Sequence, residues 1–220
     1  MTGESDAEPA ADSRRGGRPS RLKAEQIRDQ ILDVATELFL EHGYGVTSIE
    51  AIARRARISK RTFYHRFRDK ADLFGAVVHR VVQRLRPERG VAVFEGLEFE
   101  ETLRRMAALM VRAALAPQAL AIQRVIIAEA RRFPELAAVL NEEGTRAEAI
   151  RYITGILEQE ARRGTLALPD PAFAAEQFMQ MVVSAPQRRA LGLGSPMAEV
   201  ELDQWAQNAV DLFLKGCRTR

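Results

Sequence analysis

Residues 47–67, TSIEAIARRARISKRTFYHRF, are the stretch that decides the expected fold. Thr47 and Glu50 have the S/T-x-x-E spacing of a capping box, so a short helix is expected to begin there. Its apolar pattern breaks at residues 57–58, and Ser59 can then cap a second short helix. Two short helices joined by a tight turn are typical of the helix-turn-helix motif.

The second of these helices has two chemically different sides. Phe63 and Phe67 are four residues apart and can pack on the first helix. The opposite side offers donors for phosphate oxygens and base edges, and a helix of this size fits the major groove of DNA. Its residues are Lys60, Arg61, Tyr64, His65 and Arg68, flanked by Thr62 and Arg66. An ordinary amphipathic bundle helix is the alternative, but it does not explain why residues 51–68 contain no carboxylate.

The basic charge of the chain is concentrated around this motif. The 220 residues carry a formal net charge of +3, and residues 81–220 hold 18 basic and 18 acidic side chains. Residues 54–70, in contrast, hold eight basic side chains and one acidic one. Such a local excess indicates a surface that binds a polyanion, unless it is only a solvated face beside an acidic neighbour.

Helical patterns continue on both sides of the motif. Apolar residues recur at three- and four-residue steps over residues 27–39, and Gly43 can end that helix. Asp69 can cap a further helix, and Pro87 and Gly90 are expected to end it. No period-2 strand pattern of useful length occurs, so the expected fold class is all-α. Further helices are expected at about 98–115, 118–132, 135–163, 171–190 and 197–216, with prolines between them.

Three segments are expected along the chain. Residues 1–20 are rich in Gly, Pro, Ala, Ser and charge without apolar periodicity, which predicts a disordered arm with a basic end. Residues 21–70 are expected to form a three-helix helix-turn-helix domain. Residues 71–220 are expected to form a larger helical bundle.

The spacing of the motif has a known counterpart. Residues 43–56 read G-Y-x-x-T-S-I-x-x-I-A-x-x-A, and residues 59–73 read S-K-x-T-F-Y-x-x-F-x-D-K-x-x-L. These patterns resemble the N-terminal domain of TetR-family transcriptional regulators, over about residues 25–75. Arg57 departs from that pattern, because the family often has glycine in the turn. Residues 124–137, RVIIAEARRFPELA, resemble the corresponding segment of the AefR-like branch of the family.

The resemblance implies roles for individual residues at the DNA surface. Base edges are expected to be approached by Lys60, Arg61 and His65. Phosphates are expected to be contacted by Thr47, Ser48, Thr62, Tyr64 and Lys70. Lys70 is also expected to open a helix, whose free N–H groups and dipole favour an anion. Arg18 and Arg21 of the arm would reach an adjacent groove or the backbone, or else belong to a solubilising tail.

The last two predicted helices are apolar over more than one stripe. A helix that packs only on its own core needs one stripe, so a second stripe favours a partner, and the resemblance implies a homodimer. The expected interface residues are Phe178, Met181, Val182, Trp205, Ala209 and Phe213. The alternative is that both helices are buried centrally in one subunit. A two-fold dimer would read a near-palindromic double-stranded DNA site.

A pocket for a small hydrophobic ligand is expected within the larger bundle. Its candidate lining residues are Leu103, Met106, Met110, Ile122, Ile126 and Tyr152. Methionine adapts to varied apolar shapes, but it fills cores just as readily, so plain core packing is the competing interpretation.

These features favour a DNA-binding transcriptional regulator, a repressor that a small molecule releases from its operator. A ligand-independent regulator, an activator and an architectural DNA-binding protein are alternatives. An all-helical enzyme is a weaker one, since no metal-ligand cluster, nucleophile elbow or Gly-rich phosphate loop occurs. The single cysteine, Cys217, excludes a disulfide framework and a Cys-based zinc site. No cofactor is expected, and the absence of a membrane span or signal segment makes a cytoplasmic protein the expectation.

Overall fold

The computed structural model describes residues 21–85, 93–136 and 145–218, and their regular secondary structure is helical. This confirms the all-α prediction. Besides the helices, the described residues contain an isolated antiparallel β-bridge between Leu166 and Arg218. The helices are α1 (Arg21–His42), α2 (Ile49–Arg55), α3 (Lys60–Tyr64), α4 (Lys70–Arg84), α5 (Phe99–Leu115), α6 (Pro117–Glu129), α8 (Thr145–Arg162), α9 (Pro171–Ala190) and α10 (Glu199–Cys217).

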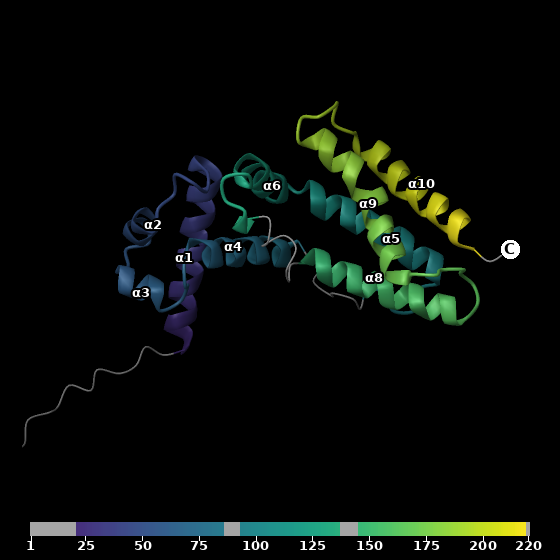
Figure 1. Ribbon diagram of the computed structural model, residues 1–220, viewed down its shortest axis with the longest axis horizontal. Coiled ribbons are helices and arrows are strands. Elements are labelled where there is room, and N and C mark those ends of the chain that lie inside the picture. The colour runs from purple at the N-terminus through teal and green to yellow at the C-terminus, as the bar shows by residue number, and fades with distance from the viewer. Residues whose placement is uncertain (1–20, 86–92, 137–144, 219–220) are drawn as a thin grey trace, which may run out of the picture.

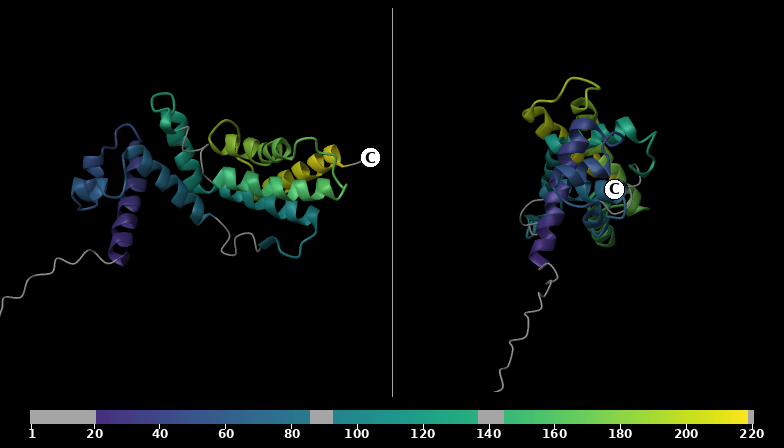
Figure 2. Two further views of the ribbon diagram at one scale, coloured as in Figure 1. Left: turned by 60° about the horizontal axis from the view of Figure 1, so that its bottom comes forward. Right: turned by 90° about the vertical axis from the view of Figure 1, so that its left-hand side faces the viewer.

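The helices pack into two groups at opposite ends of an elongated molecule (Figure 1). The first core joins α1–α4 with α6, around buried side chains that include Phe39, Phe63 and Phe74. The second core joins α5, α8, α9 and α10, around buried side chains that include Leu103 and Phe178. The left view of Figure 2 shows the same separation, with the short helices α2 and α3 far from α10, and the right view looks along the long axis of the molecule.

Helix α4 begins at the predicted domain boundary and runs from the N-terminal helices toward α8 (Figure 1). Its buried side chains all belong to the first core, so α4 packs with the N-terminal helices. They are Leu73, Phe74, Val77, Val78 and Val81. Helix α6 also contributes to the first core, through Ile122 and Ile126.

Side-chain caps start three of the N-terminal helices. Ser59 and Asp69 cap α3 and α4 as predicted, accepting hydrogen bonds from the Thr62 and Asp72 main chains at 3.1 and 2.8 Å. The predicted cap at Thr47 is wrong, because Ser48 accepts the bond from Ala51 and so caps α2. Thr47 is unsuited to the cap since its side chain is buried inside the preceding turn.

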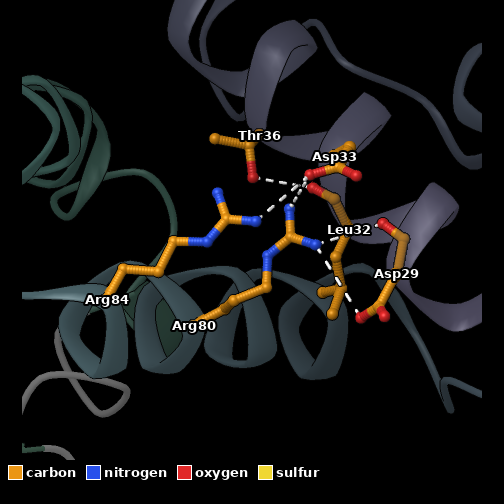
Figure 3. Close-up of polar contacts among 6 residues, drawn as sticks. All are labelled: Asp29, Leu32, Asp33, Thr36, Arg80 and Arg84. Carbon is orange, nitrogen blue, oxygen red and sulfur yellow. Dashed lines mark hydrogen bonds and ion pairs between the residues drawn. The ribbon is translucent and has the colours of Figure 1, made fainter. Parts of the chain in front are cut away.

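An arginine pair fixes α4 against α1 (Figure 3). The Nη2 atom of Arg80 lies 2.5 Å from Oδ1 of Asp33, and its Nη1 atom donates to the Asp29 carbonyl oxygen at 3.1 Å. Arg84 lies on the same side of α4, with Nη2 at 3.7 Å from the same Asp33 oxygen. The Arg80 side chain is 16% exposed and that of Asp33 is 56% exposed, so the pair lies at the edge of the packed surface and its carboxylate is open to solvent. The two helices are therefore joined by charge as well as by apolar packing.

The turn between α2 and α3 is tight. Arg57 has φ = 52°, in the left-handed region. Among the described residues, all others with a positive φ are glycines. The Arg57 N–H donates to the Arg54 carbonyl at 3.1 Å, and the Ile58 N–H donates to the Ala53 carbonyl at 2.9 Å. The departure from glycine at Arg57 therefore places an ordinary L-residue in a conformation that glycine adopts more easily.

None of the described helices is by itself long and apolar enough to span a membrane. Helices α5 and α6 meet that criterion of length and composition only as a pair, and the pair is bent by 62°.

We predict that Arg57→Val makes the protein less stable than Arg57→Asn, by about 1 kcal/mol. Both substitutions remove the same charge, but asparagine tolerates a positive φ and a β-branched residue does not. Urea unfolding of the two variants measures the difference. Equal free energies of unfolding for the two variants would mean that the turn between α2 and α3 can adopt a conformation without a positive φ at little cost in stability.

Candidate nucleic-acid interface

Helix α3 is held in place by its aromatic side. Phe63 of α3 is 0% exposed and Phe67, three residues beyond the end of α3, is 2% exposed, and their ring centroids lie 5.7 Å apart in the first core. With these two rings buried, the helix can turn its other side only toward solvent. The predicted reading face is therefore on the surface, at the end of the molecule remote from α10 (Figure 1).

The residues predicted to approach base edges are all exposed and lie together on this face. Lys60 forms an ion pair with Glu50 of α2, and that hydrogen bond raises the pKa of the lysine above its usual value. The side chains of Arg61 and His65 form no hydrogen bond or ion pair within the described residues. Two donors are thus free for an external acceptor, while the third is held by a carboxylate.

Two further residues of α3 differ in what they offer a phosphate. The Thr62 hydroxyl is 2.9 Å from that of Ser59, so it is part of the cap at the start of the helix. Tyr64 is 54% exposed, and its ring stands edge-on to Phe63 with the centroids 5.4 Å apart. Packing on one edge fixes the ring and leaves the Tyr64 hydroxyl at the surface, where it can donate to a phosphate.

Thr47 and Ser48 are adjacent but have different surroundings. Thr47 is 3% exposed, and its hydroxyl lies 2.8 Å from the Gly43 carbonyl and 3.1 Å from the Leu38 carbonyl. That hydroxyl is committed to the end of α1 and is not available to a phosphate. Ser48 is exposed at the N-terminus of α2, next to free main-chain N–H groups. Of the two predicted phosphate contacts, the geometry favours Ser48.

The Lys70 side chain points back into the protein. Its Nζ atom donates to the carbonyl oxygens of Tyr44 and Thr47 at 2.8 and 3.0 Å. It also lies 4.3 Å from the centroid of the Tyr44 ring, in a cation–π arrangement. Burial lowers the pKa of Lys70 below its usual value. Two of the three ammonium N–H groups are thus used inside the protein, so the predicted phosphate contact, which stays a prediction, would have to use the third.

The arm residues predicted to reach DNA are only partly covered by the structure. Arg18 lies outside the described residues. Arg21 begins α1, and its side chain is likewise outside the description. Their contacts with DNA stay predictions.

The six residues predicted to line a pocket do not come together. Ile122 and Ile126 belong to the first core, whereas the other four belong to the second. Those four are Leu103, Met106, Met110 and Tyr152. Two clefts of about 560 and 240 Å³ lie elsewhere: the larger is lined by Glu98, Arg104 and Glu160 among others, and the smaller by Val111 and Leu202. None of the six residues lines either cleft.

Four of the six predicted interface residues are buried in the subunit's own second core, and Met181 and Trp205 are partly buried beside them. Phe178 and Val182 are 0% exposed in a single chain, and Phe213 is 6% exposed with its ring centroid 5.0 Å from that of Phe178. The Trp205 Nε1–H donates to the Met181 and Val182 carbonyls at 3.2 and 3.0 Å. Ala209 is 8% exposed. Burial within one subunit therefore accounts for Phe178, Val182, Ala209 and Phe213, whereas Met181 and Trp205 keep part of their surface exposed, and the dimer contact stays a prediction.

Within the described residues no group of three or more His, Cys, Asp or Glu side chains could hold a metal ion.

Two family models match this chain. Residues 31–77 match the model of bacterial regulatory proteins of the tetR family. Residues 101–216 match the model of the C-terminal domain of AefR-like transcriptional repressors. Together the two matches cover the reading helix, α4 up to residue 77 and the helices of the second core.

Individual relatives agree with these models. The chain is 39% identical over 77 residues to the transcriptional activator FasR of Mycolicibacterium smegmatis, covering 35% of this chain and 34% of FasR. It is 32% identical over 124 residues to the transcriptional regulator UidR of Escherichia coli K12, covering 54% of this chain and 60% of UidR. These matches span less than two thirds of either relative. The solved structure of the flavonoid-responsive regulator FrrA has a TM-score of 0.74 and 31% identity, covering 89% of this chain and 99% of that one.

We predict that Arg61→Ala and His65→Ala relax the preference for particular bases. A lost base-edge hydrogen bond should cost about 1–3 kcal/mol on the preferred site and less on a site already altered at that base pair. Titration of each variant against the best site and its single-base variants measures this. Tyr64→Phe serves as the comparison, because loss of a phosphate contact should weaken binding to all sites alike. Unchanged preference in both alanine variants would mean that α3 does not read bases.

We predict that Lys70→Met leaves the dependence of DNA affinity on salt unchanged while lowering the free energy of unfolding by about 1 kcal/mol. Two of the three N–H groups of its ammonium donate to carbonyls of the α1–α2 turn, so we expect the group to support the fold rather than to bind a phosphate. Salt titrations and urea unfolding measure the two effects. Lys215→Met, an exposed lysine on α10, is the matched control for stability. A log–log salt slope reduced by about 0.9 would mean that Lys70 does contact a phosphate.

Proposed function

The chain belongs to the TetR family of bacterial regulatory proteins, and we propose that it represses transcription from a near-palindromic operator until a small molecule releases it. The observation that carries this proposal is the exposed side of α3. It presents cations, a tyrosine hydroxyl and an imidazole, and residues 51–68 hold no carboxylate. A buried aromatic side fixes its direction, as a surface that enters the major groove requires.

The proposed division of labour follows the three segments expected along the chain. An arm of residues 1–20 would add basic charge near the DNA, residues 21–70 would read it, and residues 71–220 would respond to a ligand and join two copies. The proposed base contacts are made by Lys60, Arg61 and His65. The proposed phosphate contacts are made by Ser48 and Tyr64, with Arg18 and Arg21 reaching an adjacent groove.

Repression and ligand response rest on the relatives. The second family model describes AefR-like repressors, and it matches residues 101–216. FrrA is a flavonoid-responsive regulator similar to this chain over almost its whole length. FasR is an activator, but its match extends over only 77 residues. Activation is therefore the second candidate. The relatives are transcriptional regulators, which supports a non-enzymatic, cytoplasmic protein.

We further propose that two copies meet through the outer sides of α9 and α10. Helix α9 packs on α5, α8 and α10 within the subunit, and its remaining side is exposed at Phe173. On α10 the exposed apolar residues are Val200 and Leu212, at 80% and 65%. Exposed apolar side chains of this size gain from burial against a second copy. Two-fold pairing would place one reading helix per subunit against each half of a near-palindrome.

Footprinting on genomic fragments selected by the protein tests the function. A protected near-palindrome of two half-sites about one helical turn apart is expected. A screen of small aromatic and aliphatic compounds for loss of that footprint tests the response. Absence of any sequence-specific site at physiological salt would overturn the proposal. Protection that no compound affects would favour the alternative of a ligand-independent regulator.

We predict that Leu212→Glu weakens dimerisation and leaves the subunit folded. The leucine is 65% exposed in a single chain, so the fold loses little, whereas an unpaired carboxylate would be desolvated in an interface. Sedimentation equilibrium measures the dimer and circular dichroism the helical content. Leu22→Glu, at a leucine 72% exposed on α1, is the matched control. A folded Leu212→Glu variant that stays a tight dimer would remove this side of α10 from the interface.

A further inference from the structure

The chain that leaves α6 docks on the turn between α1 and α2. The carboxylate of Glu129 accepts a hydrogen bond from the Gly45 main-chain N–H, with Oε1 at 3.0 Å. The ring of Phe133 stands edge-on to that of Tyr44, with the centroids 5.1 Å apart. The Tyr44 hydroxyl donates to Glu135 at 3.4 Å. A segment 84 to 91 residues away in sequence therefore contacts both the main chain and the side chain of this turn.

The two glycines of the turn make this approach possible. A Cβ atom at Gly45 would lie 2.8 Å from Oε2 of Glu129 and 3.0 Å from the ring of Phe133. A Cβ atom at Gly43 would lie 2.7 Å from the other oxygen of Glu129, and this residue also has a φ of +85°. Such distances are below van der Waals contact. Any side chain at Gly45 must therefore displace Glu129 or Phe133.

Lys70 joins a third element to the same cluster. Besides its two bonds to carbonyls of the turn, its Nζ atom lies 5.5 Å from the Phe133 ring centroid. The carboxylates of Glu129 and Glu135 both act to raise the pKa of Lys70, although burial outweighs them and lowers it. Because Lys70 is the first residue of α4, the cluster holds the end of α6, the α1–α2 turn and the start of α4 together.

The other side of α6 is connected to the second core's helices. The Nη2 atom of Arg124 donates to the carbonyl of Ala190, the last residue of α9, at 3.2 Å. Helix α6 thus touches α9, which we have placed in the dimer, and ends on the turn that precedes the helix-turn-helix motif. A rigid helix contacting both regions can carry a displacement from one to the other.

We propose that Glu129, Phe133 and Lys70 form a junction on the Gly43–Gly45 turn, and that this junction sets the orientation of the reading domain on the rest of the subunit. The inference deepens the proposed function and rests on it. In a dimer, fixed reading helices make the second half-site contact effectively intramolecular. If the orientation of the reading helices is no longer fixed, binding of the full site must also restrict their motion, which costs conformational entropy. Binding of one half-site does not require a fixed orientation.

Two substitutions that open the junction from opposite sides test this proposal. Glu129→Ala removes the acceptor, and Gly45→Ala adds the methyl group that displaces it; Gly45 has no positive φ that would strain an alanine. Both should lower affinity for the full operator about tenfold, with half-site affinity and the salt slope unchanged. Glu129→Gln keeps an acceptor oxygen and should restore most of the affinity.

Matched controls separate the junction from general effects. Gly155→Ala lies in α8 with nothing within 4 Å of its new methyl group, and Glu158→Ala removes an exposed carboxylate of the same helix. Both should bind the full site like the wild type. A loss of full-site and half-site affinity by the same factor in the junction variants would overturn the proposal, because it would indicate damage to the reading domain itself.

Measurements without DNA distinguish failure of the junction proposal from failure of the proposed function. Hydrogen exchange at the Gly45 amide should accelerate in Glu129→Ala and not in Glu129→Gln. Spin labels on Arg54 of α2 and Arg151 of α8, with Cys217 replaced by serine, should give a broader distance distribution in Glu129→Ala. An unchanged exchange rate or distribution would overturn the junction even if operator binding is found. If both change but no operator exists, the proposed function fails and the junction stands.

Discussion

Burial of the Phe63 ring is the interaction on which the candidate interface depends. Helix α3 has five residues, too few for a helix to persist in water by its own hydrogen bonds. It exists because its aromatic side is packed in the first core, with Phe63 completely buried. The same packing fixes the rotation of the helix about its axis. The direction of every cation on the opposite side is a consequence of that contact.

The features predicted correctly from the sequence are those determined by short-range chemistry. Ser59 and Asp69 cap their helices because the bond each one makes spans only three residues. The all-α class follows from apolar spacing along single helices. Thr47 was misassigned as a cap because its burial depends on α1, and the carbonyl of Leu38 that it contacts lies nine residues away. Local spacing contains no information on that contact.

Where each apolar side chain packs could not be predicted for a related reason. A sequence indicates which residues are apolar, but not which of two cores each one joins. The apolar stripes of α9 and α10 were interpreted as a surface for a partner, and α9 also packs on three helices of its own subunit, which accounts for part of that pattern. The role of Lys70 was also beyond reach, since its carbonyl partners belong to a turn more than 20 residues away. The glycines at positions 43 and 45, together with the motif at residues 124–137, were the available sign that two distant segments meet closely.

The ion pair between Lys60 and Glu50 has a consequence for how the protein searches a genome. On an arbitrary stretch of DNA the pair can stay closed, so Lys60 contributes little attraction and the Glu50 carboxylate repels the phosphates. At a site that offers an acceptor in the right position, Lys60 can exchange one partner for another. The exposed pair is cheap to open, since solvent screens it. If Lys60 makes the proposed base contact, Glu50 competes with DNA for the ammonium group and favours release from sequences that offer no acceptor.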